Sequence, residues 1–318
     1  MSTGSLVGSF VRQDAFKRFS NFALAILILN ILVILWGVVV RATGSGAGCG
    51  SHWPLCNGEV IPLDPKVETL IEFSHRLSSG LALLGVVALF ALARRTFGPN
   101  HAVRRFAFLA LVFMVIESLI GAVLVLFELV GRNASATRAV VISLHLLNTL
   151  VLLGFLALTW WRSRFPQAKS EISQKTFPSR RNVFVFAIAI LLIGSSGAIA
   201  ALGNTLFPSS TLVEGLRQDL NPTAHFLIRL RVFHPIFGLV GAGLVLSIIY
   251  RALEADTRPL VRKLGWGVIV LGAVQLVGGF FTLILLAPTW LQMFHLFFAD
   301  LLWIVFVLFI DTKRNSYL

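Results

Sequence analysis

The chain has 318 residues, of which 57% are hydrophobic and 13% are charged, and its formal net charge is +13. A soluble globular domain normally contains fewer apolar and more charged residues, so the composition excludes an ordinary soluble protein. The basic excess would suit a nucleic-acid-binding protein, but the distribution of the basic residues along the chain argues against that class.

Eight apolar segments are each long enough to cross a bilayer as a helix. In chain order they are 22–40, 70–93, 106–128, 139–161, 183–203, 226–250, 264–287 and 291–310. The first follows a basic N-terminus, but it is longer than the apolar region of a signal peptide and lacks a small-residue cleavage pattern. We therefore predict an all-α integral membrane protein whose first segment is a permanent span.

Lys and Arg gather in alternate connections between these segments. Of the 27 basic residues, 19 lie at the two ends of the chain and in the connections 94–105, 162–182 and 251–263. The positive-inside rule places such segments in the cytoplasm, so we expect both termini there. The charge is then explained by topology in a multi-pass cell-membrane protein surrounded by lipid, and we expect no nucleic-acid partner.

The two cysteines, Cys49 and Cys56, both lie in the first connection on the external side. A disulfide can persist outside the cytoplasm, so the compartment favours a bridge between them. Two free thiols, or one half of a metal site, are the alternatives.

The sequence divides into two halves of four predicted helices each. Residues of the same kind recur at similar spacing: Gly37 with Gly197, His75 with His234, Glu117 with Gln275, and His145 with His295. Because each repeat has an even number of spans, the halves should be related by an axis along the membrane normal, as two pseudo-symmetric four-helix bundles. We predict an N-terminal half at 1–161, a cytoplasmic linker at 162–182 and a C-terminal half at 183–318.

The four histidines of this repeat point to two metal sites. His75 and His145 in the first half, and His234 and His295 in the second, all fall in the outer part of helices that run inward. Ionisable residues inside spans usually face the bundle interior and mark function, although a single one can be a hydrogen-bonded core residue. Zinc needs more ligands than two histidines, whereas haem iron needs only axial ligands. Two haem sites are therefore preferred.

Four arginines near the outer face are candidates for binding haem propionates. They are Arg41, Arg76, Arg229 and Arg231. Arginine suits bidentate carboxylate binding, and the alternative is that these side chains snorkel to the membrane interface.

The halves differ at one position beside the histidines. Glu72 precedes His75 by one turn, whereas Arg231 precedes His234 at the same spacing. A carboxyl group on the same helix face could take part in proton transfer, and the alternative is an ion pair with Arg76. We infer that the N-terminal site performs chemistry and that the C-terminal site holds a fixed cofactor.

The external run RATGSGAGCGSHWPLCNGEVIP, followed by IEFSHR, resembles the haem A synthase family over essentially the whole chain. The resemblance implies oxidation of the C8 methyl group of haem O to a formyl group by successive hydroxylations, with oxygen from water. It implies that His75 and His145 bind the substrate haem O, that His234 and His295 ligate a resident haem b that passes electrons, and that Glu72 is the family's important acid. Cys49 and Cys56 match the family's first external pair, and no second pair occurs in 204–225.

Two other functions fit the same residues. One is a di-haem b membrane electron carrier without haem chemistry, and the other is a haem-transfer or assembly protein. If the chain is the enzyme, haem O is its expected substrate, and haem O synthase is a candidate partner by pathway logic. Its product would serve cytochrome oxidase assembly. The sequence does not identify the electron acceptor.

Overall fold

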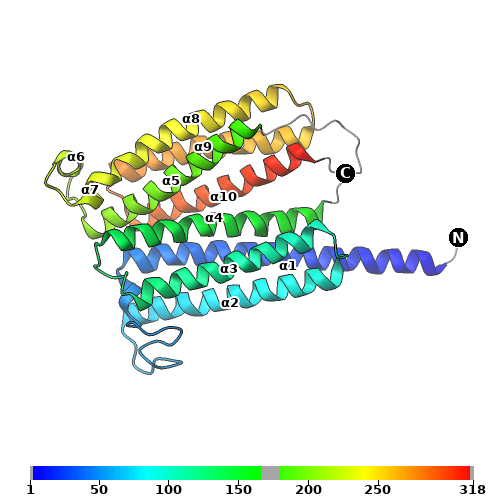
Figure 1. Ribbon diagram of the computed structural model, residues 1–318, viewed down its shortest axis with the longest axis horizontal. Helices are drawn as coiled ribbons and strands as arrows, with labels where there is room; N and C mark the ends of the chain where they lie inside the picture. The colour runs from blue at the N-terminus through cyan, green and yellow to red at the C-terminus, as the bar shows by residue number, and fades with distance from the viewer. Residues whose placement is uncertain (1–2, 166–178, 316–318) are drawn as a thin grey trace.

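The computed structural model describes residues 3–165 and 179–315, which form helices and connections without a named strand (Figure 1). The long helices are α1 (Thr3–Ala42), α2 (Val67–Thr96), α3 (Ala102–Leu126), α4 (Ala136–Arg164), α5 (Arg180–Leu206), α8 (Phe233–Glu254), α9 (Pro259–Ile284) and α10 (Thr289–Arg314). The short ones are η1 (Ser45–Ala47), α6 (Leu212–Leu220) and α7 (Phe226–Arg231). Within the described ranges, eight helices are long and apolar enough to span a membrane, which confirms the predicted fold class.

The sixth span differs from the single helix expected from its hydropathy. It consists of α7 and α8, which meet at Val232. Pro235 lies in the first turn of α8, where its missing N–H is tolerated, but its ring excludes a regular helix through the residue four positions earlier, Arg231. The break therefore follows from the proline, and it lies beside His234.

The segment 204–225, which we predict to be external, contains a helix that the hydrophobic pattern does not predict. This helix, α6, begins after Thr211, whose hydroxyl accepts the backbone N–H of Glu214 at 3.2 Å. The Glu214 carboxylate in turn accepts the N–H of Ser210 at 3.0 Å, so side chains satisfy backbone donors at the helix start.

The helices form two groups that lie side by side, α1 to α4 in one and α5 with α8 to α10 in the other (Figure 1). Helices α4 and α10 pack against each other between the groups, and Trp303 Nε1 donates to Leu150 O at 2.5 Å across this contact. Ile304 and Leu308 of α10 belong to the core formed by α1 to α4. The halves are thus joined by α10, while their pseudo-symmetry and the predicted boundaries stay predictions. Most of the predicted linker, 166–178, lies outside the described residues.

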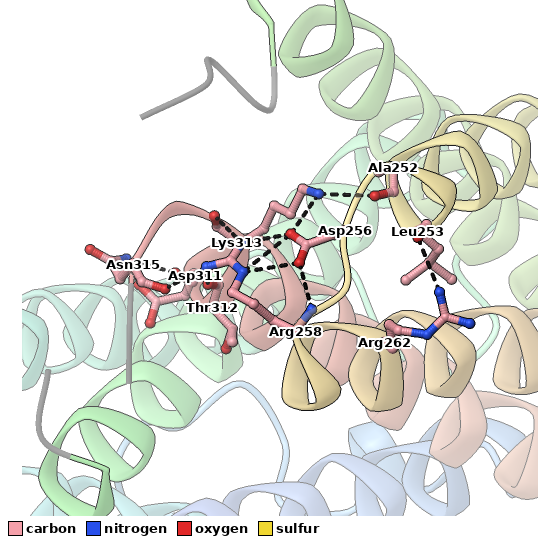
Figure 2. Close-up of polar contacts among 9 residues, drawn as sticks. All are labelled: Ala252, Leu253, Asp256, Arg258, Arg262, Asp311, Thr312, Lys313 and Asn315. Carbon is pink, nitrogen blue, oxygen red and sulfur yellow. Dashed lines mark hydrogen bonds and ion pairs between the residues drawn. The ribbon is translucent and has the colours of Figure 1, made fainter. Parts of the chain in front are cut away.

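Charged side chains fasten the helix ends on the side that we predict to be cytoplasmic. Figure 2 shows Asp256, in the connection from α8 to α9, between Arg258 at 2.7 Å and Lys313 of α10 at 2.8 Å. Burial raises the pKa of the Asp256 carboxyl, but the hydrogen bonds from Arg258 and Lys313 outweigh it and hold the pKa below its usual value. A second ion pair, Arg162 with Asp311, joins α4 to α10 at the same end.

Candidate functional site

The two histidines of the second half face each other. The ring centroids of His234 on α8 and His295 on α10 are 6.3 Å apart, and the rings are nearly perpendicular, at 85°. Two iron–nitrogen bonds of ~2 Å each, with ~1.1 Å from each nitrogen to its ring centre, add up to about 6 Å. The centroid distance therefore matches the length needed for one iron between the two imidazoles, and His234 and His295 are the residues that would hold it.

Glycines on neighbouring helices make room for these rings. A Cβ atom added at Gly197 of α5 would lie 3.0 Å from His234 Cε1, and one at Gly279 of α9 would lie 3.2 Å from His295 Cε1. The repeat position in the first half, Gly37 of α1, stands in the same relation to His75 at 3.4 Å. Glycine permits this close approach because it has no side chain.

The first-half pair comes from α2 and α4, which carry His75 and His145 within their first three turns. Within the described ranges, the Nδ1 atoms of His75, His145 and His295 are buried and make no hydrogen bond. A buried imidazole with an unsatisfied ring nitrogen is unusual, and a further group bound by the ring is one explanation of it. The donor set of two imidazoles in each half therefore fits haem.

An apolar groove of about 460 Å³ runs beside His295. Its lining includes Val274, Gly278, Trp290, Phe294 and Phe298 from α9 and α10. A concave surface of aromatic and aliphatic side chains with a single imidazole suits a large, flat and mainly apolar group such as a porphyrin.

Glu72 is buried on α2 and anchors the connection between α1 and α2. Its Oε2 accepts the backbone N–H of Cys49 at 2.7 Å, and its Oε1 accepts Arg76 Nη2 at 2.5 Å. The ion pair with Arg76, the alternative from the sequence, is therefore present. Arg76 also donates through Nη1 to His52 O and Leu55 O, at 2.6 Å each, so both residues tie the loop to α2. A role for Glu72 in proton transfer, or for Arg76 in binding a propionate, stays a prediction.

Cys49 and Cys56 form the predicted disulfide, with a sulfur–sulfur distance of 2.00 Å. The bridge closes the loop that contains His52 and Leu55, the two residues whose carbonyls Arg76 contacts. The covalent closure and the Glu72–Arg76 pair thus hold the same loop against the N-terminal part of α2.

In the second half Arg231 holds the connection between α5 and α7, as Glu72 holds the connection in the first half, although the two side chains have opposite charges. It is buried, its Nε donates to Asp219 Oδ1 at 2.5 Å, and its Nη2 lies 3.3 Å from Gly215 O. These contacts hold α6 and its flanking residues against α7. The difference between Glu72 and Arg231 is therefore also a difference in how each half fastens its external segment, which the sequence does not reveal.

The other two arginines lie in different surroundings. Arg41, at the end of α1, donates to Ala201 O at 2.7 Å, to the Thr205 hydroxyl and to Gln292 Oε1 at 2.6 Å, so it bridges the two halves. Arg229 is exposed on α7. Neither arrangement tests the predicted propionate contacts.

Two polar residues contact the histidines from α3 and α9. Glu117 Oε1 lies 3.3 Å from His145 Nδ1, and Gln275 Nε2 lies 3.3 Å from His295 Nε2. In the sequence both appear as matching positions of the repeat, without an assigned role. Their polarity inside apolar helices was the signal that could have found them.

Comparison with known proteins places this geometry in context. A family model described as "Cytochrome oxidase assembly protein" matches residues 20–307. A protein named "Protoheme IX farnesyltransferase" from Thermus thermophilus is 46% identical over 298 residues, covering 93% of this chain and 48% of the relative. Proteins named "Heme A synthase" match about a third of the chain. The protein from Exiguobacterium sibiricum is 41% identical over 112 residues, which cover 38% of its length. The protein from Bacillus mycoides is 42% identical over 112 residues, which cover 36% of its length. The chain spans about half the length of the Thermus relative, and the matched segments cover a smaller share of the other two proteins.

Proposed function

Because the chain belongs to the cytochrome oxidase assembly protein family, we propose that it is a haem A synthase, an oxidoreductase that converts the C8 methyl group of haem O to a formyl group. The observation that carries the proposal is the pair of histidines in each half, one pair spaced for a single iron. The similarity to proteins named "Heme A synthase" supports the reaction.

In this proposal His75 and His145 bind the iron of the substrate haem O, and His234 and His295 hold a resident haem b. When bound, haem b supplies a carrier for single electrons. Gly37, Gly197 and Gly279 let the imidazoles lie against neighbouring helices, which fixes the orientation of the rings. The loop closed by Cys49 and Cys56 is held to α2 by Glu72 and Arg76, at the end of the helix that carries His75.

The oxidation of the methyl group requires water as the source of oxygen and an acceptor for the electrons. Each hydroxylation, R–CH3 + H2O → R–CH2OH + 2 H⁺ + 2 e⁻, releases two protons and two electrons. A second hydroxylation gives a geminal diol, which loses water to leave the formyl group. Glu72 is the carboxyl group that we propose to accept protons from this reaction, because it lies one turn from His75 on the same helix. The two electrons of each hydroxylation pass to an acceptor that is yet to be identified, and a haem held by His234 and His295 would supply a carrier for them.

The Thermus relative raises a second function, because its name describes farnesyl transfer to protohaem. That name belongs to a protein of which this chain covers 48%, so the activity can reside in the part that has no counterpart here. We therefore propose that a haem O synthase is a partner of this chain and supplies its substrate, rather than that this chain transfers the farnesyl group.

The proposed orientation follows the basic residues. Arg94, Arg95, Arg162, Arg164 and Lys313 occupy the last turns of α2, α4 and α10, which end on the same side of the bundle. With that side and both termini in the cytoplasm of a cell-membrane protein, the histidine pairs lie toward the outer face.

The test is the extraction and chromatography of haems from membranes of a host that makes haem O but no haem A, with and without this chain. Appearance of haem A, or of its hydroxylated precursor, supports the proposal. Haem O left unchanged in membranes that contain the folded, haem-loaded protein would favour a di-haem electron carrier. A second host that lacks haem O synthase tests farnesyl transfer, because haem O formed there would assign that activity to this chain.

A further inference from the structure

We propose that Glu117 is a positioning residue for His145, and that the contrast between Glu117 and Gln275 gives the two haem sites different reduction potentials. The inference rests on the proposed function, since it requires iron on both histidine pairs. It names the residues that would favour electron flow from the first half to the second.

The Glu117 carboxylate is held beside His145 by side chains of the helix that carries the histidine. Asn148 Nδ2 donates to Glu117 Oε2 at 2.5 Å and also lies 2.9 Å from Phe113 O of α3. The Thr149 hydroxyl donates to Oε1, the oxygen that lies 3.3 Å from His145 Nδ1. Asn148 and Thr149 follow His145 by three and four residues, so all three share one helix face. The carboxylate is thus fixed within reach of the imidazole.

The Nδ1 atom of His145 is near this oxygen but not aligned with it, because it makes no hydrogen bond within the described ranges. A small rotation of the ring would complete the bond, and catalytic hydrogen bonds are often loose until the ligand is bound. With Nδ1 turned to Glu117, the opposite nitrogen, Nε2, is the one presented to an iron. Histidine ligands of metals commonly donate their second ring N–H to a carboxylate in this way.

The second half lacks this arrangement at every equivalent position. Gln275 replaces Glu117, and the residues three and four positions after His295 are Phe298 and Ala299 instead of asparagine and threonine. The Gln275 amide touches His295 Nε2 at 3.3 Å, and its own Oε1 is buried without a partner among the described residues. A buried carboxylate must be stabilised by hydrogen-bond donors, whereas a neutral amide has no such need. The replacement of Glu117 by Gln275 therefore explains why asparagine and threonine are also replaced, by Phe298 and Ala299.

The contrast has a physical consequence for iron. A carboxylate is a stronger acceptor than an amide oxygen, and a hydrogen bond to it makes the imidazole a more electron-donating ligand. A more donating ligand stabilises ferric over ferrous iron and lowers the reduction potential. The haem on His75 and His145 then has the lower potential of the two. Electrons released at the first site therefore move downhill to the haem on His234 and His295.

The test is a redox titration of the purified, haem-loaded protein, followed by optical and electron paramagnetic resonance spectra of each haem. Glu117→Gln should raise the potential of the first-half haem. At a fixed ambient potential, its ratio of reduced to oxidised iron should rise about tenfold, which corresponds to 59 mV for one electron. Gln275→Glu should shift the second-half haem the opposite way, and each variant should leave the other haem unchanged.

Thr149→Val provides an independent variant of similar shape. It removes the donor that competes with His145 for Oε1, so it should lower the potential of the first-half haem, opposite to Glu117→Gln. The matched control is Glu128→Gln, which removes an exposed carboxylate from the connection between α3 and α4 and should shift neither haem.

The proposal is overturned if Glu117→Gln and Thr149→Val bind two haems with the potentials and spectra of the parent protein. It is also overturned if both variants shift the potential in the same direction, because a general loss of packing would do that. If the parent protein binds no haem at all, the proposed function fails instead, and the two failures are thereby distinguished.

Discussion

Replacing Gly197 with alanine should displace His234 and weaken haem binding in the second half. The new Cβ would lie 3.0 Å from His234 Cε1, whereas carbon atoms in contact prefer about 3.5–4.0 Å. The ring must therefore move by roughly 0.5 Å or more, which is the tolerance of a typical ligand site. Overpacking of this kind costs about 1–3 kcal/mol. If that cost falls on the loaded site, affinity for haem drops roughly 5- to 140-fold.

Two other glycine-to-alanine variants provide a weaker case and a control for this prediction. Gly37→Ala should have a smaller effect on the first-half site, because its Cβ would meet His75 Cε1 at 3.4 Å, an ordinary contact distance. Gly243→Ala is the matched control on α8, where an added Cβ meets nothing within 4 Å. Alanine favours a helix by about 1 kcal/mol over glycine, so none of the three should unfold the protein for lack of helix propensity.

The assay is a haem titration of detergent-solubilised protein, with bound haem measured per protein by absorbance. The expected order of affinity loss is Gly197→Ala greatest, Gly37→Ala small and Gly243→Ala none. Equal affinities for all three variants would refute the reasoning, because the close approach of the ring to α5 would then have no bearing on the ligand position.

Three further changes test other parts of the structure. Asp256→Asn should destabilise the protein by about 1–3 kcal/mol at neutral pH. The folded pKa of Asp256 lies below its ordinary value of ~3.9, so the stabilisation by its ionised carboxylate is complete above pH ~3.9. It is lost as the pH falls through the folded pKa. The free energies of unfolding of variant and parent should therefore become equal in acid. Asp300→Asn should leave thermal stability unchanged or raised, since both carboxylate oxygens are buried without a partner among the described residues; a large loss would reveal a partner. Glu72→Gln should retain haem but form no haem A in the membrane assay, and full conversion by this variant would remove Glu72 from the proposed chemistry.

The histidine pairs were within reach of sequence reasoning because their signal is local. An imidazole inside an apolar run is unusual by itself, and counting residues from the ends of the spans places all four at a common depth. The eight spans are local in the same sense, since length and hydropathy define them. The disulfide needed only two cysteines in one external connection, so the structure confirms a prediction that had few alternatives.

The partners of the charged residues were not predictable in this way. For Arg76 the sequence predicts a propionate contact, which stays a prediction, but it does not reveal that the guanidinium lies against carbonyls 21 and 24 residues earlier in the chain. Arg231 similarly finds Asp219 and Gly215 on a helix that no hydrophobic pattern indicated. A long side chain can reach many partners, and the folding of the external segments decides among them. The role of Glu117 required the position of Asn148 and Thr149 on a facing helix, which the sequence alone does not supply.

The packing of α10 has a consequence for biogenesis. Ile304 and Leu308 fill the interior formed by α1 to α4, and Trp303 is bonded to α4. A ribosome delivers helices to the membrane in chain order, so the first bundle waits for the last helix before its interior is closed. Haem O that arrived during translation would meet an open and incompletely packed bundle. On the proposed function, the complete first site is therefore offered to haem O only once α10 is in place.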